Sequence, residues 1–200
     1  AKAPAEIAGT RFEEPIQVLS ALKIMIGDDN GKFRPDDTII RSEVAKMAIH
    51  ALGLEGAAEA SKGISKFPDV VQNHWANGYI NLATSKGIII GDENGNFRPD
   101  DTITYAEAMT IMVRTLGYEP VAKEKGGFPN GYILTASENG LAKNVEGSAN
   151  KAITRGNVAF LTMNSLETKL MEQTNFGPVP EHSVVDKTLL TDRLGVKKYQ

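Results

Sequence analysis

The chain has 200 residues, of which 41% are hydrophobic and 24% charged, enough apolar material to bury a core in one or two compact domains. Its net charge of −3 lacks the basic excess typical of nucleic-acid-binding proteins, so nucleic acid is not an expected partner. Apolar runs such as Ile88-Ile89-Ile90 are far shorter than the ~20 residues of a transmembrane helix. Cysteine is absent, which excludes disulfides, thiolate nucleophiles and cysteine-ligated metals.

One loop sequence occurs twice in the chain. Residues 26–39 and 90–103 both carry Ile-Gly-Asp, Asn-Gly and Phe-Arg-Pro-Asp-Asp-Thr-Ile in the same order, 64 positions apart. The same shift pairs Ile16 with Ile80 and Glu43 with Glu107, so a unit with segments on both sides of the loop has been duplicated.

A third, worn copy follows. Gly131-Tyr132-Ile133 and Gly140 repeat Gly78-Tyr79-Ile80 and Gly87 at a shift of 53, and Ile153-Thr154-Arg155 repeats Ile103-Thr104-Tyr105 at a shift of 50. The third loop is therefore three residues shorter, and it keeps Asn144 to Ser148 where the other copies have the Gly-Asp and Phe-Arg-Pro signature.

Within each unit the apolar spacing predicts a short helix, a loop of tight turns, and a second helix. Apolar residues at helical spacing mark the first helix, which ends at Gly87 and Gly140 in the second and third copies. The second helix starts directly after the loop, and Thr104 with Glu107 forms a predicted capping box. Because one such pair cannot bury its apolar face, we predict an all-α fold, a pseudo-threefold bundle of three helix–loop–helix modules with short extended pieces in the loops.

The predicted boundaries follow from the repeat. Residues 1–54, 67–118 and 128–170 form the three modules, the first with an atypical start, and the repeat pattern stops near residue 171. Residues 171–200 are expected to be irregular or β-type, because Val184-Val185 and Leu189-Leu190 lack helical period. They either begin a following domain or pack back on the bundle as an arm.

Motifs in the second copy carry a family resemblance that covers roughly residues 3–170. Phe67-Pro68-Asp69-Val70 with His74-Trp75-Ala76, and Ile103-Thr104-Tyr105-Ala106-Glu107, resemble the opening and closing motifs of the S-layer homology family. The resemblance implies an extracellular, non-catalytic module without cofactors that anchors a bacterial surface protein to the cell wall. Its partner would be a secondary cell-wall polysaccharide, often ending in pyruvylated N-acetylmannosamine, held in grooves between the modules, with other S-layer subunits as further partners.

By the same resemblance, the arginine of the closing motif meets the carboxylate of the ligand, and that position is Arg41 in the first copy and Arg155 in the third. The second copy has Tyr105 there, a further candidate for carbohydrate binding, whose groove either fails to bind a ketal carboxylate or binds the sugar by stacking. Fewer than three equivalent sites are therefore expected. The remaining candidates for carbohydrate binding are Gly91 and Asp92, in a turn expected to line a groove, together with Asp69 and Trp75.

These candidates also admit structural interpretations. Arg41 and Arg155 begin a helix, where amides and helix dipole favour an anion, but each could equally be a solvated surface residue or a partner of Asp36 or Asp37. Trp75 could stack on a sugar or anchor the core of its module.

Other functions have less support in the sequence. Glu43 and Glu107 follow helix starts by three residues, so capping explains them better than a catalytic carboxylate pair. The Gly-Asp loops lack the acidic twelfth residue of a calcium-binding hand, and the histidines have no metal-ligand spacing, so no metal site is predicted. The alternative to polysaccharide binding is an S-layer lattice or protein-interaction module that binds no carbohydrate.

Overall fold

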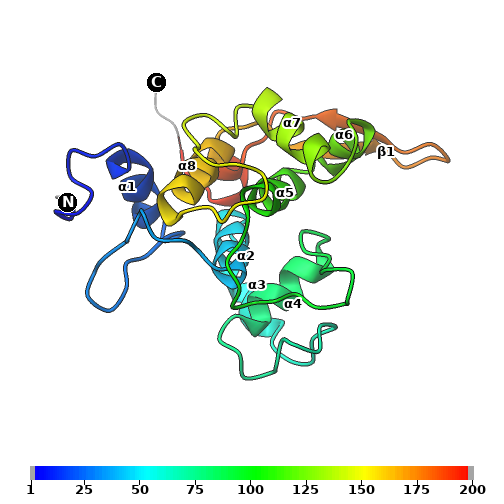
Figure 1. Ribbon diagram of the computed structural model, residues 1–200. Coiled ribbons are helices and arrows are strands. Elements are labelled where there is room, and N and C mark those ends of the chain that lie inside the picture. Colours follow the sequence, from blue (N-terminus) through cyan, green and yellow to red (C-terminus); the bar gives the residue numbers. More distant parts are fainter. Residues whose placement is uncertain (1–2, 198–200) are drawn as a thin grey trace.

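The computed structural model describes residues 3–197, and helices dominate it (Figure 1). The three repeat units each contribute an outer and a central helix. In chain order the helices are α1 (Glu13–Ala21), α2 (Arg41–Ala51), α3 (Glu55–Ala60), α4 (Asn77–Ser85), α5 (Tyr105–Thr115), α6 (Glu119–Glu124), α7 (Asn130–Glu138) and α8 (Arg155–Leu166). The predicted all-α, pseudo-threefold class is confirmed.

Three central helices, α2, α5 and α8, pack against one another around the pseudo-threefold axis. Each outer helix packs on the central helix of the preceding unit, since α4 packs on α2, α7 on α5, and α1 on α8. The last of these contacts closes the ring, because it joins the first unit to the third (Figure 1). Each helix pair is thus formed by an outer helix of one unit and the central helix of another, and the three pairs together form a closed ring.

Main-chain hydrogen bonds run around the centre of this ring. The amide of Ile39 donates to the carbonyl of Ile153 (3.3 Å), that of Ile153 to Ile103 (3.0 Å), and that of Ile103 to Ile39 (3.1 Å). All three isoleucine side chains are buried. The end of each loop is therefore paired with the ends of the two other loops.

The central helices begin in the same cyclic way. The first amide of α2, at Arg41, donates to Asp101 (2.9 Å), that of α5, at Tyr105, to Lys151 (2.9 Å), and that of α8, at Arg155, to Asp37 (2.8 Å). These amides have no partner within their own helix, so the neighbouring loop satisfies them.

Short helices α3 and α6 lie in the two linkers, where the sequence predicted none. They approach the outer helices closely, because a Cβ atom at Gly78 would lie 2.1 Å from the carbonyl oxygen of Ala58, and one at Gly131 would lie 2.2 Å from that of Ala122. This approach explains the glycine in both Gly-Tyr-Ile motifs. The outer helices end as predicted, with Gly87 in the left-handed conformation (φ +72°) just past α4.

The tail forms an antiparallel hairpin of β1 (Met171–Asn175) and β2 (Glu181–Val184), followed by a π-helical turn, η1 (Leu189–Arg193). The hairpin projects from the body of the molecule (Figure 1), and its turn exposes Phe176. The π-helical turn packs back on α2 and α8, where Leu189 is fully buried. No helix in residues 3–197 has the length and apolar character needed to cross a membrane.

Candidate functional site: the grooves between units

Two grooves occupy equivalent places in the first and second units. Groove 1, of about 200 Å³, is lined by residues 24–26 and α2 of the first unit, with Arg155 from the third unit and Trp75 from the second. Groove 2, of about 520 Å³, is lined by residues 88–93 and α5 of the second unit, with Arg41 from the first and Phe128 from the third. Each groove is therefore built from all three units, so only the closed ring assembles it.

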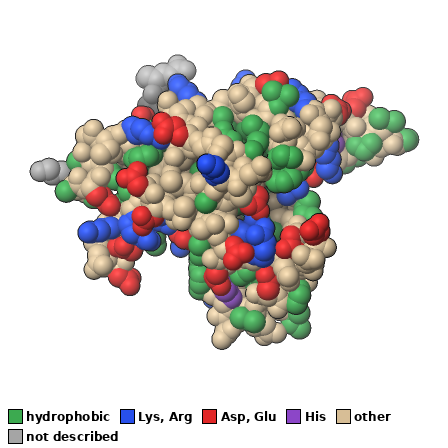
Figure 2. All heavy atoms as spheres, viewed as in Figure 1, with side chains coloured by type: hydrophobic (Ala, Val, Ile, Leu, Met, Phe, Trp, Pro, Cys, Tyr) green, Lys and Arg blue, Asp and Glu red, His purple; other side chains and the backbone are tan. Residues whose placement is uncertain are grey.

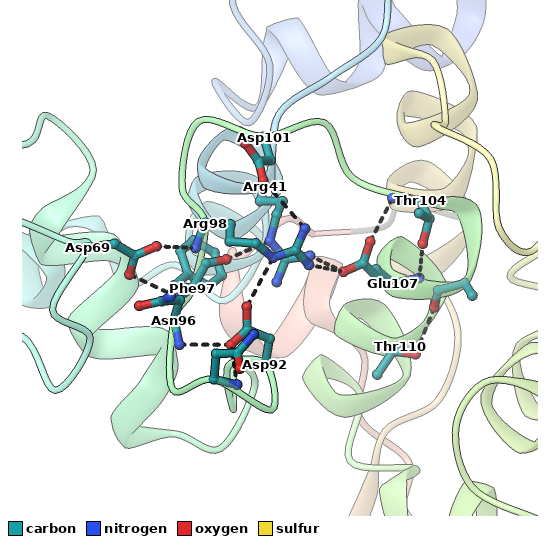
Figure 3. Close-up of polar contacts among 12 residues, drawn as sticks. Arg41, Asp69, Asp92, Asn96, Phe97, Arg98, Asp101, Thr104, Glu107 and Thr110 are labelled. Atoms are coloured by element: carbon teal, nitrogen blue, oxygen red, sulfur yellow. Dashed lines mark hydrogen bonds and ion pairs between the residues drawn. The ribbon is translucent and has the colours of Figure 1, made fainter.

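The closing-motif arginines cross from one unit into the next. In Figure 3 Arg41 reaches the second loop, where its Nε donates to the carbonyl of Phe97 (2.7 Å) and its Nη1 donates to the carboxylate of Glu107. The guanidinium carbon lies 4.9 Å from the centre of the Phe97 ring. The remaining nitrogen, Nη2, has no hydrogen-bond partner in residues 3–197, so it remains available in the groove.

Arg155 repeats this arrangement in groove 1. Its Nε donates to the carbonyl of Phe33 (2.7 Å), and its Nη1 donates to Glu43. Both arginine side chains are buried and form ion pairs with a glutamate of the next unit, so neither is a solvated surface side chain or the ion-pair partner of Asp36 or Asp37. Burial lowers the pKa of the Arg41 guanidinium and Glu107 raises it; an arginine keeps its charge under such opposing effects.

The two glutamates differ in how they meet the helix start. Glu107 forms the predicted capping box with Thr104, and it also binds Arg41 and Arg98 (Figure 3). For Glu43 the capping interpretation is wrong, because no capping hydrogen bond joins it to Ile40, the residue before α2, within the described part of the chain. Glu43 serves Arg155 instead.

Asp92 organises the turn that forms one wall of groove 2. Its Oδ1 accepts hydrogen bonds from the amides of Asn94 and Asn96, both 2.9 Å long, and its Oδ2 lies 3.2 Å from Nε of Arg98. The bond from Asn96 is the main cause that lowers the pKa of Asp92. Gly91 and Asp92 both line the groove.

Asp69 lies behind the loop and does not line either groove. Its two carboxylate oxygens accept the amides of Phe97 (3.1 Å) and Arg98 (2.7 Å), and Arg98 has a left-handed backbone (φ +60°) (Figure 3). A side chain with a Cβ rarely adopts that conformation, so Asp69 holds a strained loop in place. In the first unit Glu6 does the same for Phe33 and for Arg34.

Aromatic residues form the rim of each groove. Trp75, which is 49% exposed, lines groove 1, and Phe128, which is 58% exposed, lines groove 2. The two occupy the same repeat position, since Phe128 follows Trp75 at the shift of 53. Trp75 is therefore a groove residue and is not a core anchor.

The third inter-unit groove is filled by side chains of the chain itself. Arg11 occupies the repeat position of Trp75, and its Nη2 donates to Oδ1 of Asn157 (2.8 Å), the residue that replaces Glu107 in the third unit. The guanidinium of Arg11 also stacks on Phe12 and Phe160. Tyr105 lies against Gly147 of the shortened loop, where a Cβ atom would come within 2.6 Å of its ring.

Sequence reasoning missed several residues that shape these grooves. Phe128 and Arg11 could have been found, because the repeat shifts place both in register with Trp75. The glutamate partners of Arg41 and Arg155 could not have been found in this way, because each lies in a different unit from its arginine.

On the face shown in Figure 2, acidic and basic side chains gather where the lobe of α3 and α4 meets the rest of the molecule.

Comparison with known proteins finds one domain family in the first two copies of the repeat. Residues 7–45 and 66–109 match the S-layer homology domain. The chain is 38% identical over 92% of its length to the middle cell wall protein of Brevibacillus brevis, and 36% identical over 92% to the surface layer protein of Brevibacillus choshinensis. It is also 33% identical over 80% to a cell surface protein of Thermoanaerobacter kivui. It spans only 17%, 16% and 21% of these relatives.

Proposed function

Because the chain belongs to the S-layer homology family and to the bacterial cell surface, we propose that it anchors its protein to the cell wall by binding secondary cell-wall polysaccharide in grooves 1 and 2. The observation that carries this proposal is the shared construction of the two grooves. Each combines a buried arginine, whose Nη2 has no hydrogen-bond partner within residues 3–197, with a half-exposed aromatic ring on the rim.

This combination suits a sugar polymer. A pyranose ring has an apolar face that can lie on Trp75 or Phe128, while its hydroxyl or carboxylate oxygens accept from the guanidinium of Arg155 or Arg41. Two modest sites on one chain bind a repeating polymer more tightly than either site alone, because the second contact forms within the same complex. Groove 3 takes no part, since Arg11, Phe12 and Phe160 fill it.

The test is cosedimentation of the full chain with purified cell walls, before and after removal of the wall polysaccharide. Trp75→Ala and Phe128→Ala should each weaken binding about fivefold, and the double variant more, because stacking of this kind contributes about 1 kcal/mol. Both residues are half-exposed, so the fold should tolerate the change. Phe176→Ala is the matched control, because it also removes an aromatic ring, at a more exposed residue in the hairpin and outside both grooves.

Binding that survives removal of the polysaccharide would contradict the proposal, and so would full binding by the double variant. Arg41→Ala is a less clean test, since it leaves the carboxylate of Glu107 without its main partner.

A second function, a protein-contact module of the surface lattice, is favoured by one observation. The turn of the β1–β2 hairpin exposes Phe176 and Val179 by 81% and 72%. Under this alternative Phe176→Ala, and neither groove variant, would reduce self-association measured by sedimentation velocity, and polysaccharide would have no effect.

A further inference from the structure

Grooves 1 and 2 share helix α2. Its first residue, Arg41, lines groove 2, while Glu43 and Lys46 further along the same helix line groove 1. A helix moves largely as one piece over so short a length, because its main-chain hydrogen bonds join successive turns. A change in the position of the start of α2 therefore reaches both grooves.

The second loop, residues 90–103, holds the start of α2 in place. The amide of Arg41 donates to the carbonyl of Asp101 (2.9 Å), and the amide of Ser42 donates to that of Pro99 (3.1 Å) (Figure 3). Asp100 lies between these two acceptors in the chain. The backbone on both sides of Asp100 is thus bonded to α2.

The side chain of His74 joins Asp100 to the rim of groove 1. Its Nδ1 accepts from the amide of Ala76 (3.0 Å), and its Nε2 lies 2.9 Å from Oδ1 of Asp100. Because an amide can only donate, Nδ1 is the acceptor and Nε2 carries the proton that it donates to the carboxylate. The His74 side chain is only 11% exposed, and its ring centre lies 5.8 Å from that of Trp75, with 29° between the planes.

The repeat shows that this bridge is peculiar to the second unit. Thr10 and Gly127 occupy the position of His74 in the first and third units. Thr10 also accepts from the amide two residues further on, that of Phe12 (3.3 Å), but its hydroxyl donates to the carbonyl of Ile7 (2.7 Å). Gly127 has no side chain. Among these three positions, all within residues 3–197, only His74 reaches the loop, and it does so between grooves 1 and 2.

We propose that His74 is a positioning residue that couples the two grooves, so that a sugar bound in groove 2 strengthens binding in groove 1. This inference rests on polysaccharide binding as the function. A ligand held by Arg41 restrains the second loop and the start of α2, and through Asp100 and His74 it restrains Trp75. Binding in groove 1 then orders a rim that is already restrained, which is a coupling free energy between two sites and acts equally in both directions.

The test uses oligosaccharides released from purified wall polysaccharide by partial acid hydrolysis and sized so that none spans both grooves, which removes avidity. Trp75 is the only tryptophan of the chain, so its fluorescence reports the occupancy of groove 1 when the full chain is titrated. Phe128→Ala weakens groove 2 and does not touch the lining of groove 1. It should nevertheless weaken the binding that Trp75 reports, by about fivefold.

Two variants remove the bridge from opposite ends. Asp100→Ala truncates a side chain that is 71% exposed, so the fold should tolerate it, and Phe128→Ala in this background should no longer change the reported binding. His74→Asn should have the same effect, because asparagine can still accept a bond at the start of α4 but is too short to reach the loop. Asp36→Ala, at the equivalent exposed aspartate of the first unit, is the matched control and should keep the fivefold effect.

The outcomes separate the two proposals. If Phe128→Ala leaves the binding reported by Trp75 unchanged, or if the fivefold effect persists in the Asp100→Ala background, coupling through His74 is overturned while polysaccharide binding stands. If neither the oligosaccharides nor the intact polysaccharide bind the wild-type chain, both proposals fall.

Discussion

Ser42 carries a buried hydroxyl group whose partner is missing. The residue is fully buried at the second position of α2, and its Oγ is the buried side-chain polar atom in residues 3–197 that makes no hydrogen bond. The equivalent positions hold Ala106 and Gly156, which have no polar group to satisfy. Burying a polar atom without a hydrogen bond destabilises a fold by about 1–3 kcal/mol.

Ser42→Ala should therefore raise the free energy of unfolding by about 1 kcal/mol, as measured by urea denaturation. Ala106→Ser, which introduces a hydroxyl at the matched position of the second unit, should lower it. Equal stability of Ser42→Ala and the wild-type chain would show that the hydroxyl is satisfied in solution.

His50 makes stability depend on pH. Its pKa in the folded chain is below the ordinary value of 6.5, chiefly because burial disfavours the charged form. The unfolded chain therefore binds this proton more readily, so the contribution of His50 is present above about pH 6.5 and is lost as the pH falls toward the folded pKa. Between pH 7.5 and 5.5 the melting temperature of the wild-type chain should fall more than that of His50→Gln. Identical shifts in both proteins would contradict this assignment.

At the scale of the element, the sequence predicted the outer and central helices because each buries one apolar face with a period of 3.6 residues. The linker helices α3 (Glu-Gly-Ala-Ala-Glu-Ala) and α6 (Glu-Pro-Val-Ala-Lys-Glu) were missed, since each has only six residues and one buried alanine, too few to show an apolar face. The π-helical turn was missed as well, because its anchor is a single buried Leu189. For the grooves, the position of the arginines was predictable from the repeat, but the glutamates that receive them depend on how neighbouring units meet.

The seam between α1 and α8 shows how closely two elements were fitted after the repeats diverged. A Cβ atom at Gly156 would lie 2.5 Å from Cε1 of Phe12, so the third unit needs glycine where the second has Ala106. Gly156→Ala should lower the free energy of unfolding by about 1–3 kcal/mol through this overlap.

The matched control is Gly56→Ala, a change within helix α3. The added Cβ atom would meet no other atom within 4 Å, so the free energy of unfolding should stay unchanged or rise. In the Phe12→Ala background, Gly156→Ala should cost much less unfolding free energy than in the wild-type chain, because the overlapping ring is gone. A double-mutant cycle followed by chemical denaturation would measure this difference. Additive losses would place the strain elsewhere.

At the scale of the whole molecule, the cyclic exchange predicts that no unit folds alone. The start of α5 needs Lys151 and Ala149 as acceptors, and α5 itself is covered by α7 of the next unit. A fragment of residues 67–118 should therefore lack stable helix by circular dichroism, whereas residues 1–200 should unfold in one transition with coincident probes. A fragment with native helix content would show that exchange between units is dispensable.

The ring of Ile39, Ile103 and Ile153 is closed entirely by main-chain atoms, with each residue both giving and receiving one bond. Because these bonds are made by main-chain atoms, they depend little on side-chain identity beyond size. An aromatic residue on a groove rim, an arginine at a helix start or a lysine in a groove can therefore be replaced without breaking the ring of hydrogen bonds. Tyr105, Arg11 and Lys46 illustrate that freedom, because the same backbone now supports one groove filled by side chains, one lined by equal numbers of arginines and carboxylates, and one lined by Lys46 beside Arg155 and Glu43. Triplication thus supplied a frame on which three initially interchangeable surfaces could take on separate tasks.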